Sequence, residues 1–326
     1  MTKSNLSNAQ RSPEPPVRTA WAAGSTLTPG PKRSRRSSLR GGLAPYAFIA
    51  PFYVLYVLFM IIPILAALYL SLTEWVGLGT PNFIGLANYV NLVSDSSFAT
   101  ALSNSLVYTL VAVLVVVPCA LLVAQALNTT GLRFRDMFRV AYFVPMVLSP
   151  IVIALIYSLI FDRDYGLLNS SLNALFGLPH IDWLGDPTLA KGAIGFVLLW
   201  RTVGYLTIFF LAALQNVPSE QYEAAALDGA GRIRTFFAVT VPGIKPISAF
   251  VIVTSFIGAA QLFDEPYLLT KGGPGESTIS IAMFIYRAAF ERQQFGYAAA
   301  AGVVLFVIVF AVSQCLNRLL GIGRDS

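Results

Sequence analysis

Six long intervals that carry almost no charge constrain this chain more than any other feature of its sequence. They lie at residues 41–73, 96–132, 140–161, 192–219, 246–263 and 293–317, and a single residue, Arg201, interrupts them. A helix needs about 20 mostly apolar residues to cross the ~30 Å hydrocarbon core of a membrane. The intervals therefore predict an all-α integral membrane protein with six transmembrane helices.

The composition agrees with a membrane location. Hydrophobic residues make up 56% of the chain and charged residues 12%, with a mean hydropathy of +0.68, whereas a soluble domain carries about 25% charge. The net charge of +6 could indicate nucleic acid, but that interaction needs basic residues clustered on a folded soluble face. Here the basic residues flank the apolar intervals, so we expect contact with membrane lipid and no nucleic acid.

Two of the intervals need separate comment. Interval 246–263 has only 18 residues, so its helix must run nearly upright or continue past Asp264; the alternation of inside and outside requires it. Interval 41–73 is far longer than the apolar part of a signal peptide and ends in SLTEW, without a small-residue cleavage pattern. We expect both intervals to cross the membrane.

The distribution of Lys and Arg predicts the orientation, because these residues are retained on the cytoplasmic side. With the N-terminus inside, the cytoplasmic segments hold 16 of the 22 Lys and Arg residues and the outer segments hold five. Both termini are therefore expected in the cytoplasm. Residues 1–42 are predicted to be a disordered basic tail, with a lipid-touching anchor as the alternative. Residues 43–320 are predicted to form the transmembrane domain, and residues 321–326 a short tail.

The residues that could carry chemistry are few. Cys119 and Cys315 lie inside apolar intervals and His180 is the only histidine, so we expect neither a disulfide framework nor a metal site. Isolated carboxylates such as Asp162 and Asp164 do not make a catalytic site, and no catalytic residue is predicted. An autonomous secondary transporter or channel is the alternative function, but no Asp or Glu lies inside the six intervals, where ion coupling would need one.

The loop at 218–246 is polar between two apolar intervals. It starts with Pro218 and Ser219, where the serine can cap a helix, and Glu220 and Glu223 would fall in the first turn of that helix, where negative charge complements the helix dipole. Three alanines at 224–226 favour the helix. The loop therefore begins as a short helix.

The second half of the loop predicts a turn and another helix. Gly229 and Gly231 supply the permissive backbone for the turn, residues 232–240 can form a second helix, and Pro242 and Pro246 would end it. The product is an elbow on the cytoplasmic side that suits docking by a soluble partner. A solvated loop would explain the charges but not the run of alanines beside two glycines.

The stretch EAAALDGAGRIRTFFAVTVP resembles the EAA loop of binding-protein-dependent ABC importer permeases. Glu223, Ala224, Ala225, Gly229 and Pro242 match that pattern at its full spacing, and valines at 239 and 241 stand where Ile and Leu are usual. The resemblance covers roughly residues 43–320, through FIGLANYVNLV, FVPMVLSPIVIALIYSLIF and FDEPYLLTKGGPGEST. It is strongest toward the carbohydrate-type permeases, which include the maltose and glycerol-phosphate permease components.

The resemblance implies the type I ABC importer permease fold, in the bacterial cytoplasmic (inner) membrane. It implies a subunit that forms half of an alternating-access path for a sugar-type solute. The implied partners are two copies of a cytoplasmic ATPase subunit, a second homologous permease subunit and an extracytoplasmic solute-binding protein. ATP and magnesium would bind to the ATPase subunits. The absence of a GxxxxGK[ST] phosphate-binding loop from this sequence agrees with that division.

The resemblance also implies site residues. In the family the EAA loop docks into a groove of the ATPase, and Glu223 would be its polar anchor, with Gly229 at the turn. The coupling residues expected here are Glu223, Ala224, Ala225, Asp228, Gly229 and Pro242.

Arg201 is the main candidate for the translocation path, because a charge about ten residues into a span is costly unless it is paired or hydrated. It could bind sugar hydroxyls or an anionic group. Alternatively it bonds carbonyls or a tyrosine such as Tyr205, or the fourth span starts later than residue 192. Thr254 and Gln261 are weaker candidates, since such side chains also join helices.

The outer segments give the remaining predictions. Gly272, Gly273 and Pro274 could shape an outer gate, with a plain tight turn as the alternative. Residues 82–93 and 278–290 are apolar but too short to span, and suit helices at the outer interface. Residues 164–190 have room for one or two short helices. The sequence does not identify the solute.

Overall fold

The computed structural model describes residues 44–129 and 135–321. The predicted tail at 1–42, residues 322–326 of the predicted C-terminal tail and the inner end of the interval at 96–132 lie outside the described residues. The chain divides into two compact units, residues 1–54 and 55–326, and each is described by itself. Helix α1 (Ala44–Tyr56) contains all described residues of the first unit.

Four stretches of helix are long and apolar enough to cross a membrane. They are Phe48–Leu70, Ser96–Asn128, Pro187–Gln215 and Phe295–Leu320, and they correspond to the first, second, fourth and sixth charge-free intervals. The first consists of α1, η1 (Val57–Ile61) and α2 (Ile62–Leu70), and the second of α4 (Ser96–Val111), η2 (Ala112–Val116) and α5 (Val117–Asn128). The other two are the single helices α9 (Pro187–Gln215) and α15 (Phe295–Leu320).

The third interval forms a bent pair of helices, and the single helix of the fifth interval makes a bend with the helical segment that precedes it. In the third, α6 (Arg135–Val147) and α7 (Pro150–Ile160) meet at 108°, because Ser149 precedes a proline and adopts an extended backbone. In the fifth, α13 (Lys245–Ala260) meets the helical segment Arg232–Gly243 at 74°. Counting each pair as one span gives six, and the prediction of a helical membrane protein is confirmed.

Three π-helical turns stand directly before a proline. Each has five residues, and the proline is the second residue of the helix that follows: Pro63 after η1, Pro118 after η2 and Pro242 after η3 (Phe236–Thr240). A proline lacks the N–H that the helix needs, and its ring collides with the carbonyl four residues earlier. Widening the preceding turn relieves that collision and keeps the apolar run helical.

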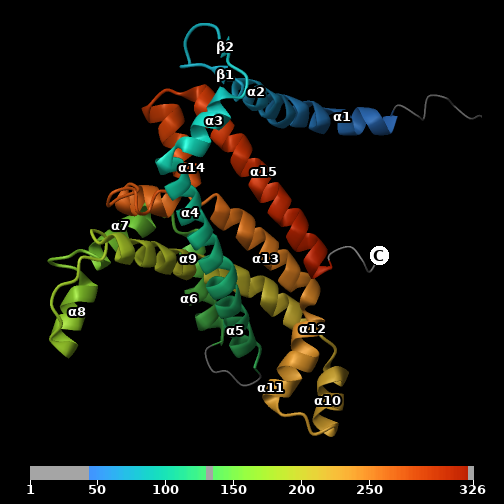
Figure 1. Cartoon of the computed structure of the whole chain (residues 1–326). Helices are drawn as coiled ribbons and strands as arrows, with labels where there is room; N and C mark the ends of the chain where they lie inside the picture. Colours follow the sequence, from blue (N-terminus) through green and yellow to red (C-terminus); the bar gives the residue numbers. More distant parts are fainter. Residues whose placement is uncertain (1–43, 130–134, 322–326) are drawn as a thin grey trace, which may run out of the picture. The chain divides into compact units, whose positions relative to one another are not determined.

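Helix α9 is the central packing element of residues 55–326. It contacts α5 along much of its length and also packs on α6 and α13, as Figure 1 shows around the α9 label. Phe210 and Leu214 of α9 join Val116 and Val251 in the largest apolar core. At Gly204 the approach is so close that a Cβ atom would overlap the backbone carbonyl oxygen of Tyr142 in α6.

A second core forms where short elements gather near the start of α15. Strands β1 (Thr73–Glu74) and β2 (Asn82–Phe83) pair antiparallel, and α3 (Ala87–Ser94) follows them. Leu92 of α3 packs with Phe98 of α4 and Phe284 of α14 (Ile281–Tyr286). The remaining short elements are α8 (Leu167–Phe176), η4 (Pro266–Thr270) and η5 (Arg287–Glu291). Helices therefore lie within both predicted segments, 82–93 and 278–290, and α8 lies within 164–190.

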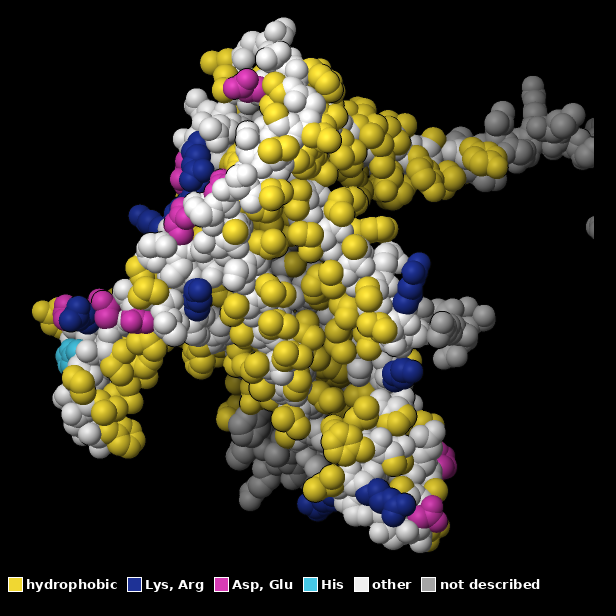
Figure 2. Space-filling view, in the orientation of Figure 1, with side chains coloured by type: hydrophobic (Ala, Val, Ile, Leu, Met, Phe, Trp, Pro, Cys, Tyr) yellow, Lys and Arg dark blue, Asp and Glu magenta, His cyan; other side chains and the backbone are white. Residues whose placement is uncertain are grey.

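Charged side chains are unevenly distributed over residues 55–326. Figure 2 shows apolar side chains over the middle of the visible face, where α4, α5, α13 and α15 lie, and charged ones toward the loops at either end. The elbow of α10 (Ser219–Leu227) and α11 (Arg232–Thr235) lies at one end, and α14 with the β-hairpin lies at the other. This is the distribution that a hydrocarbon layer between two aqueous phases requires.

Candidate functional site

The elbow closes with a Schellman turn after α10. The Gly229 N–H donates to the Ala226 carbonyl at 3.0 Å, and the Ala230 N–H donates to the Ala225 carbonyl at 2.9 Å. Gly229 has φ +73°, the left-handed conformation that this motif needs. Helix α11 then begins after Gly231, whose backbone is extended. The helix, turn and helix predicted for this loop are all present.

The two arms of the elbow are joined by a polar contact, and both carry exposed apolar side chains. The Tyr222 hydroxyl lies 3.2 Å from Oγ1 of Thr240, which is buried. Three large apolar residues of the elbow are exposed: Leu227 at 89%, Ile233 at 77% and Phe237 at 66%. Exposed apolar side chains grouped on a charged, rigid turn are typical of a protein-binding surface.

Three details of the elbow differ from the sequence prediction. Pro218, not Ser219, is the N-cap of α10, and no side chain caps it. Glu223 therefore lies in the second turn, and Glu220 is the acidic residue of the first. Pro242 does not end the second helix, because the π-turn η3 accommodates it and the helix continues through α12 (Val241–Gly243) to Ile244.

A cavity of about 820 Å³ separates the elbow from the end of α5. Leu122 and Gln125 of α5 form one wall, and Ala226, Ile233 and Phe236 of the elbow form the other. The elbow is thus attached to the helices through α9 and α13, which precede and follow it in the chain, while its contact with α5 is loose.

Arg201 lies at the middle of α9, as the fifteenth of its 29 residues. The helix begins at Pro187, earlier than the predicted interval, and the alternative that the membrane span starts later stays a prediction. The Arg201 Nε lies 2.8 Å from Oε1 of Glu265, and its Nη1 lies 3.7 Å from Oδ2 of Asp264. Glu265 is only 5% exposed. The partners of Arg201 are carboxylates, not the carbonyls or the tyrosine that the sequence suggested.

Glu265 is a residue that the sequence analysis missed. Helix α13 has 16 residues, a length of ~24 Å, so the chain turns after it and brings the following carboxylates to the middle of α9. The signal was present: an acidic pair adjoins the shortest charge-free interval, and an arginine inside a span needs a counter-charge. The absence of acidic residues from the six intervals was therefore a misleading criterion for judging whether a carboxylate lies beside a span.

Arg201 and Thr254 line one cavity of about 200 Å³, together with Thr202, Tyr205 and Ser255. The Thr254 hydroxyl bonds carbonyls of its own helix, Phe250 at 2.8 Å and Val251 at 3.1 Å. The Ser255 Oγ is buried and has no hydrogen-bond partner among the described residues. Gln261 is exposed beyond the end of α13 and is not among the residues that line this cavity.

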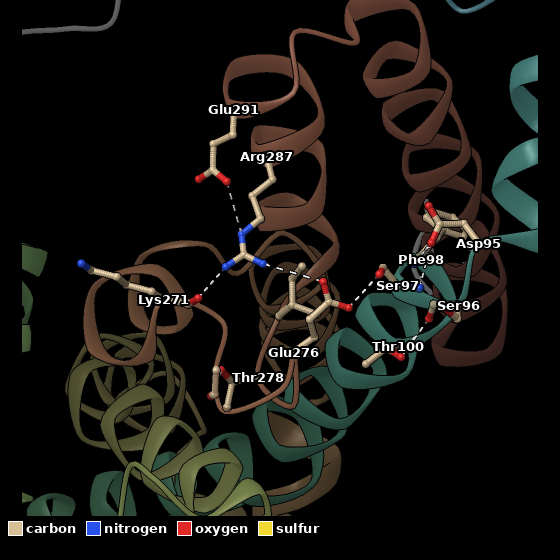
Figure 3. A network of polar contacts seen from close by, with 12 residues as sticks. Asp95, Ser96, Ser97, Phe98, Thr100, Lys271, Glu276, Thr278, Arg287 and Glu291 are labelled. Atoms are coloured by element: carbon tan, nitrogen blue, oxygen red, sulfur yellow. Dashed lines mark hydrogen bonds and ion pairs between the residues drawn. The ribbon is translucent and has the colours of Figure 1, made fainter.

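The loop after η4 is held in place by a network around Arg287. The Arg287 Nη2 donates to the Lys271 carbonyl at 2.6 Å, and its Nη1 lies 4.0 Å from Oε1 of Glu276 (Figure 3). The Glu276 carboxylate in turn accepts from the Ser97 hydroxyl at 2.7 Å. Glu291 also lies 3.8 Å from the Arg287 Nε. Arg287 thus links the loop to η5, and Glu276 links it to the start of α4.

The three residues predicted as an outer gate lie in this loop. Gly272 has φ +75°, and a Cβ there would crowd Met283 and Arg287. The Gly273 carbonyl accepts from the Thr278 hydroxyl at 2.8 Å, and the peptide bond between Gly273 and Pro274 is cis. The loop is tightly bonded rather than loose, and its role as a gate stays a prediction.

Comparison with protein families identifies one match. Residues 116–321 match the model of the "Binding-protein-dependent transport system inner membrane component" family. The matched region contains α9, the elbow, α13 and Arg287 with its partners Lys271, Glu276 and Glu291.

Curated proteins similar to this chain are permeases. The probable ABC transporter permease protein YurN of Bacillus subtilis is 38% identical over 287 residues, which cover 87% of this chain and 98% of YurN. The arabinooligosaccharides transport system permease protein AraP of the same organism is 33% identical, covering 91% of this chain and 96% of AraP. The lactose transport system permease protein LacF of Rhizobium radiobacter is 38% identical, covering 82% and 91%.

A solved structure shares the fold. A chain from the crystal structure of a bacterial ABC transporter involved in the import of the acidic polysaccharide alginate superposes with a TM-score of 0.77 at 22% identity, covering 86% of this chain and 96% of that chain. A second crystal structure of a bacterial alginate transporter, in complex with an alginate pentasaccharide-bound periplasmic protein, gives the same TM-score. At this identity the likeness concerns the fold.

Proposed function

From the premise that this chain belongs to the family of binding-protein-dependent transport system inner membrane components, we propose a specific role in solute import. The chain is a multi-pass inner membrane protein, the permease subunit of an ABC transporter and not its ATPase. Its role is to form half of the path by which a sugar-type solute enters the cell. The elbow at 219–243 transmits ATP-driven closure to the spans.

The proposal of a sugar rests on the curated relatives. AraP and LacF are named for arabinooligosaccharides and lactose, and the match covers more than four-fifths of this chain in each case. Both names denote carbohydrates, whereas the sugar that this chain carries is not defined by them. The solute class proposed is therefore carbohydrate, without a particular sugar.

The observation that carries the coupling role is the exposed elbow. Its Schellman turn fixes the angle between α10 and α11, and Leu227, Ile233 and Phe237 on its two arms are exposed. Glu223, Ala224, Ala225 and Asp228 lie on or directly after α10, next to the exposed Leu227. A rigid turn held by two spans can move those spans when a partner pulls on it, provided that the partner binds the two transport states differently.

The partner set follows from this role. Two copies of a cytoplasmic ATPase subunit bind ATP and magnesium and dock on the elbows of this chain and of a second, homologous permease subunit. An extracytoplasmic solute-binding protein delivers the sugar to the opposite face. The alginate transporter, whose permease shares this fold, was crystallised with a periplasmic protein.

Co-purification tests the coupling role. The tagged chain is extracted from native membranes in mild detergent, and the proteins that accompany it are identified by mass spectrometry. We expect an ATPase and a second permease with the wild type. The substitution Glu223→Lys should remove the ATPase selectively, because it reverses the charge on the docking surface.

Gln221→Lys is the matched control. It introduces the same side chain on the same exposed helix, but two residues away and therefore on a different face. We expect this variant to retain the ATPase. Recovery of the chain alone, or equal behaviour of the two variants, contradicts the proposed docking surface.

A further inference from the structure

Arg201 lines the cavity of about 200 Å³, and two carboxylates that are not among its lining residues lie against the guanidinium. Arg201 lies at the middle of a spanning helix and is partly exposed, while Glu265 is buried against it with an Nε to Oε1 distance of 2.8 Å. Asp264 adds a second negative charge at 3.7 Å. The three ionised side chains together carry one net negative charge.

The position of the pair bears on what the path can accept. A lone arginine in a cavity of low polarity would attract an anion strongly, because a unit charge acts further there than in water. Glu265 occupies the Nε side of the guanidinium and removes that attraction. The other polar side chains that line the cavity are the neutral hydroxyls of Thr202, Tyr205, Thr254 and Ser255, and the remaining lining residues have no polar side chain.

We propose that Glu265 is a specificity-determining residue: by pairing with Arg201 it keeps this cavity from attracting anions, so that the solute passing it is uncharged. The inference rests on the proposed function, because it assumes that the cavity belongs to the import path. It narrows the solute from carbohydrates in general to neutral ones, which hydroxyl groups and a compensated guanidinium can bind by hydrogen bonds. Acidic sugars are disfavoured by the net negative charge.

The test measures the electrical potential in the cavity directly. Thr254 is replaced by cysteine in the complete complex, with Cys119 and Cys315 replaced by serine. The labelling rates of the new thiol by an anionic and a cationic thiosulfonate reagent of similar size are then compared. Their ratio is normalised to the ratio for a small free thiol in water. We expect the normalised anion-to-cation ratio to be below one.

Glu265→Gln should then raise the ratio by about tenfold, since it removes a unit negative charge that pairs with Arg201, which lines the same cavity as residue 254. Asp264→Asn is the matched control, because it removes the same charge from a more exposed position that lies 3.7 Å from Arg201, and its effect should be smaller. Arg201→Gln should lower the ratio. The double variant Arg201→Gln, Glu265→Gln leaves no unpaired charge at the pair and should fall between the two single variants.

Two results overturn the proposal. One is a normalised anion-to-cation ratio above one in the Thr254→Cys protein with Glu265 intact. This measurement changes neither residue of the ion pair, so it can be made even if the Glu265→Gln variant fails to assemble. The other is a thiol at 254 that neither reagent reaches, because the cavity is then outside the path. Neither result affects the co-purification of an ATPase, so failure here is distinguishable from failure of the coupling role.

Discussion

Gly229 determines the shape of the elbow through its backbone alone. It has φ +73°, and no atom lies within 4 Å of the position that a Cβ would take. We predict that Gly229→Ala strains the turn by roughly 1–2 kcal/mol, the cost of the left-handed conformation for an L-residue. Hydrogen exchange of the Gly229 and Ala230 amides, which close the turn, should become faster.

Gly231→Ala is the control for that prediction. Gly231 has an extended backbone and equally open surroundings, so the same added methyl group should leave exchange unchanged. The amide exchange rates in Gly229→Asn should lie between those of the wild type and those of Gly229→Ala, because asparagine tolerates the left-handed region better than alanine. Equal exchange rates in the two alanine variants contradict the assigned role of the positive φ.

Asn104 holds the loop that contains Gly272, Gly273 and Pro274. It is 1% exposed and donates to the Ile279 carbonyl at 2.9 Å and to the Glu276 carbonyl at 3.3 Å. Asn104→Ala leaves these acceptors without that donor, and we predict a loss of about 1–3 kcal/mol of stability. The midpoint of thermal unfolding of the purified protein measures the loss.

Thr100→Ala on the same helix is the comparison. The Thr100 hydroxyl bonds only the Ser96 carbonyl within α4, so its removal should shift the midpoint little. If Thr100→Ala lowers the unfolding midpoint as much as Asn104→Ala does, then the removal of any polar side chain from α4 has this effect. The loop would then not depend on Asn104.

At the level of single residues, the sequence predicted what neighbours along the chain decide. The turn at Gly229 follows from an alanine-rich helix that ends before a glycine, and both are visible in the sequence. The ion pair of Arg201 with Glu265 joins residues that are 64 positions apart, and no local pattern specifies it. Ser97 and Glu276 are likewise brought together by packing of distant elements.

The packing of α6 on α9 depends on a glycine at the contact. A Cβ at Gly204 would overlap the Tyr142 carbonyl oxygen, whereas a Cβ at Gly195 would make ordinary contact with Val111 at 3.7 Å. Both glycines are buried in α9. We predict that Gly204→Ala destabilises the protein by about 1–3 kcal/mol, as overpacking does, because backbone atoms must move.

Gly195→Ala should be neutral or slightly stabilising, since alanine favours helix more than glycine does. The two variants can be compared by the fraction of protein that stays monodisperse on size exclusion after heating in detergent. If Gly204→Ala survives heating as well as Gly195→Ala, the close approach of α6 and α9 is not a constraint.

Prolines explain which predicted elements were straight and which were not. Pro63 and Pro118 leave their spans continuous because each follows a π-turn, whereas Pro150 begins a new helix after an extended residue. All three lie inside charge-free intervals, so the scan for spans does not distinguish them. The sequence therefore predicted the existence of the spans but not the bend of 108° within the third.

At the scale of the whole molecule, the charge pattern predicted the membrane assignment because that assignment depends on sums over long segments. The division of the chain into a tail at 1–42, a domain at 43–320 and a short C-terminal tail stays a prediction. The role of the elbow as the coupling site is a prediction of the same kind, since it concerns a partner. The geometry of the elbow, however, is specific enough to choose a residue at which a crosslinking probe would report a bound partner.

Leu227 and Val93 form a matched pair for testing the account. Both are highly exposed aliphatic residues, at 89% and 87%, and they lie on α10 and α3, at opposite ends of residues 55–326 (Figure 1). A photo-crosslinking amino acid is placed at either position in the full-length chain in native membranes. The membranes are irradiated, and the crosslinked proteins are identified by mass spectrometry.

We predict that the probe at 227 captures a cytoplasmic ATPase subunit and that the probe at 93 does not. Capture of the ATPase from position 93, or capture of no ATPase from position 227 while an ATPase still co-purifies with the chain, would contradict the central claim that this elbow connects the permease to its motor.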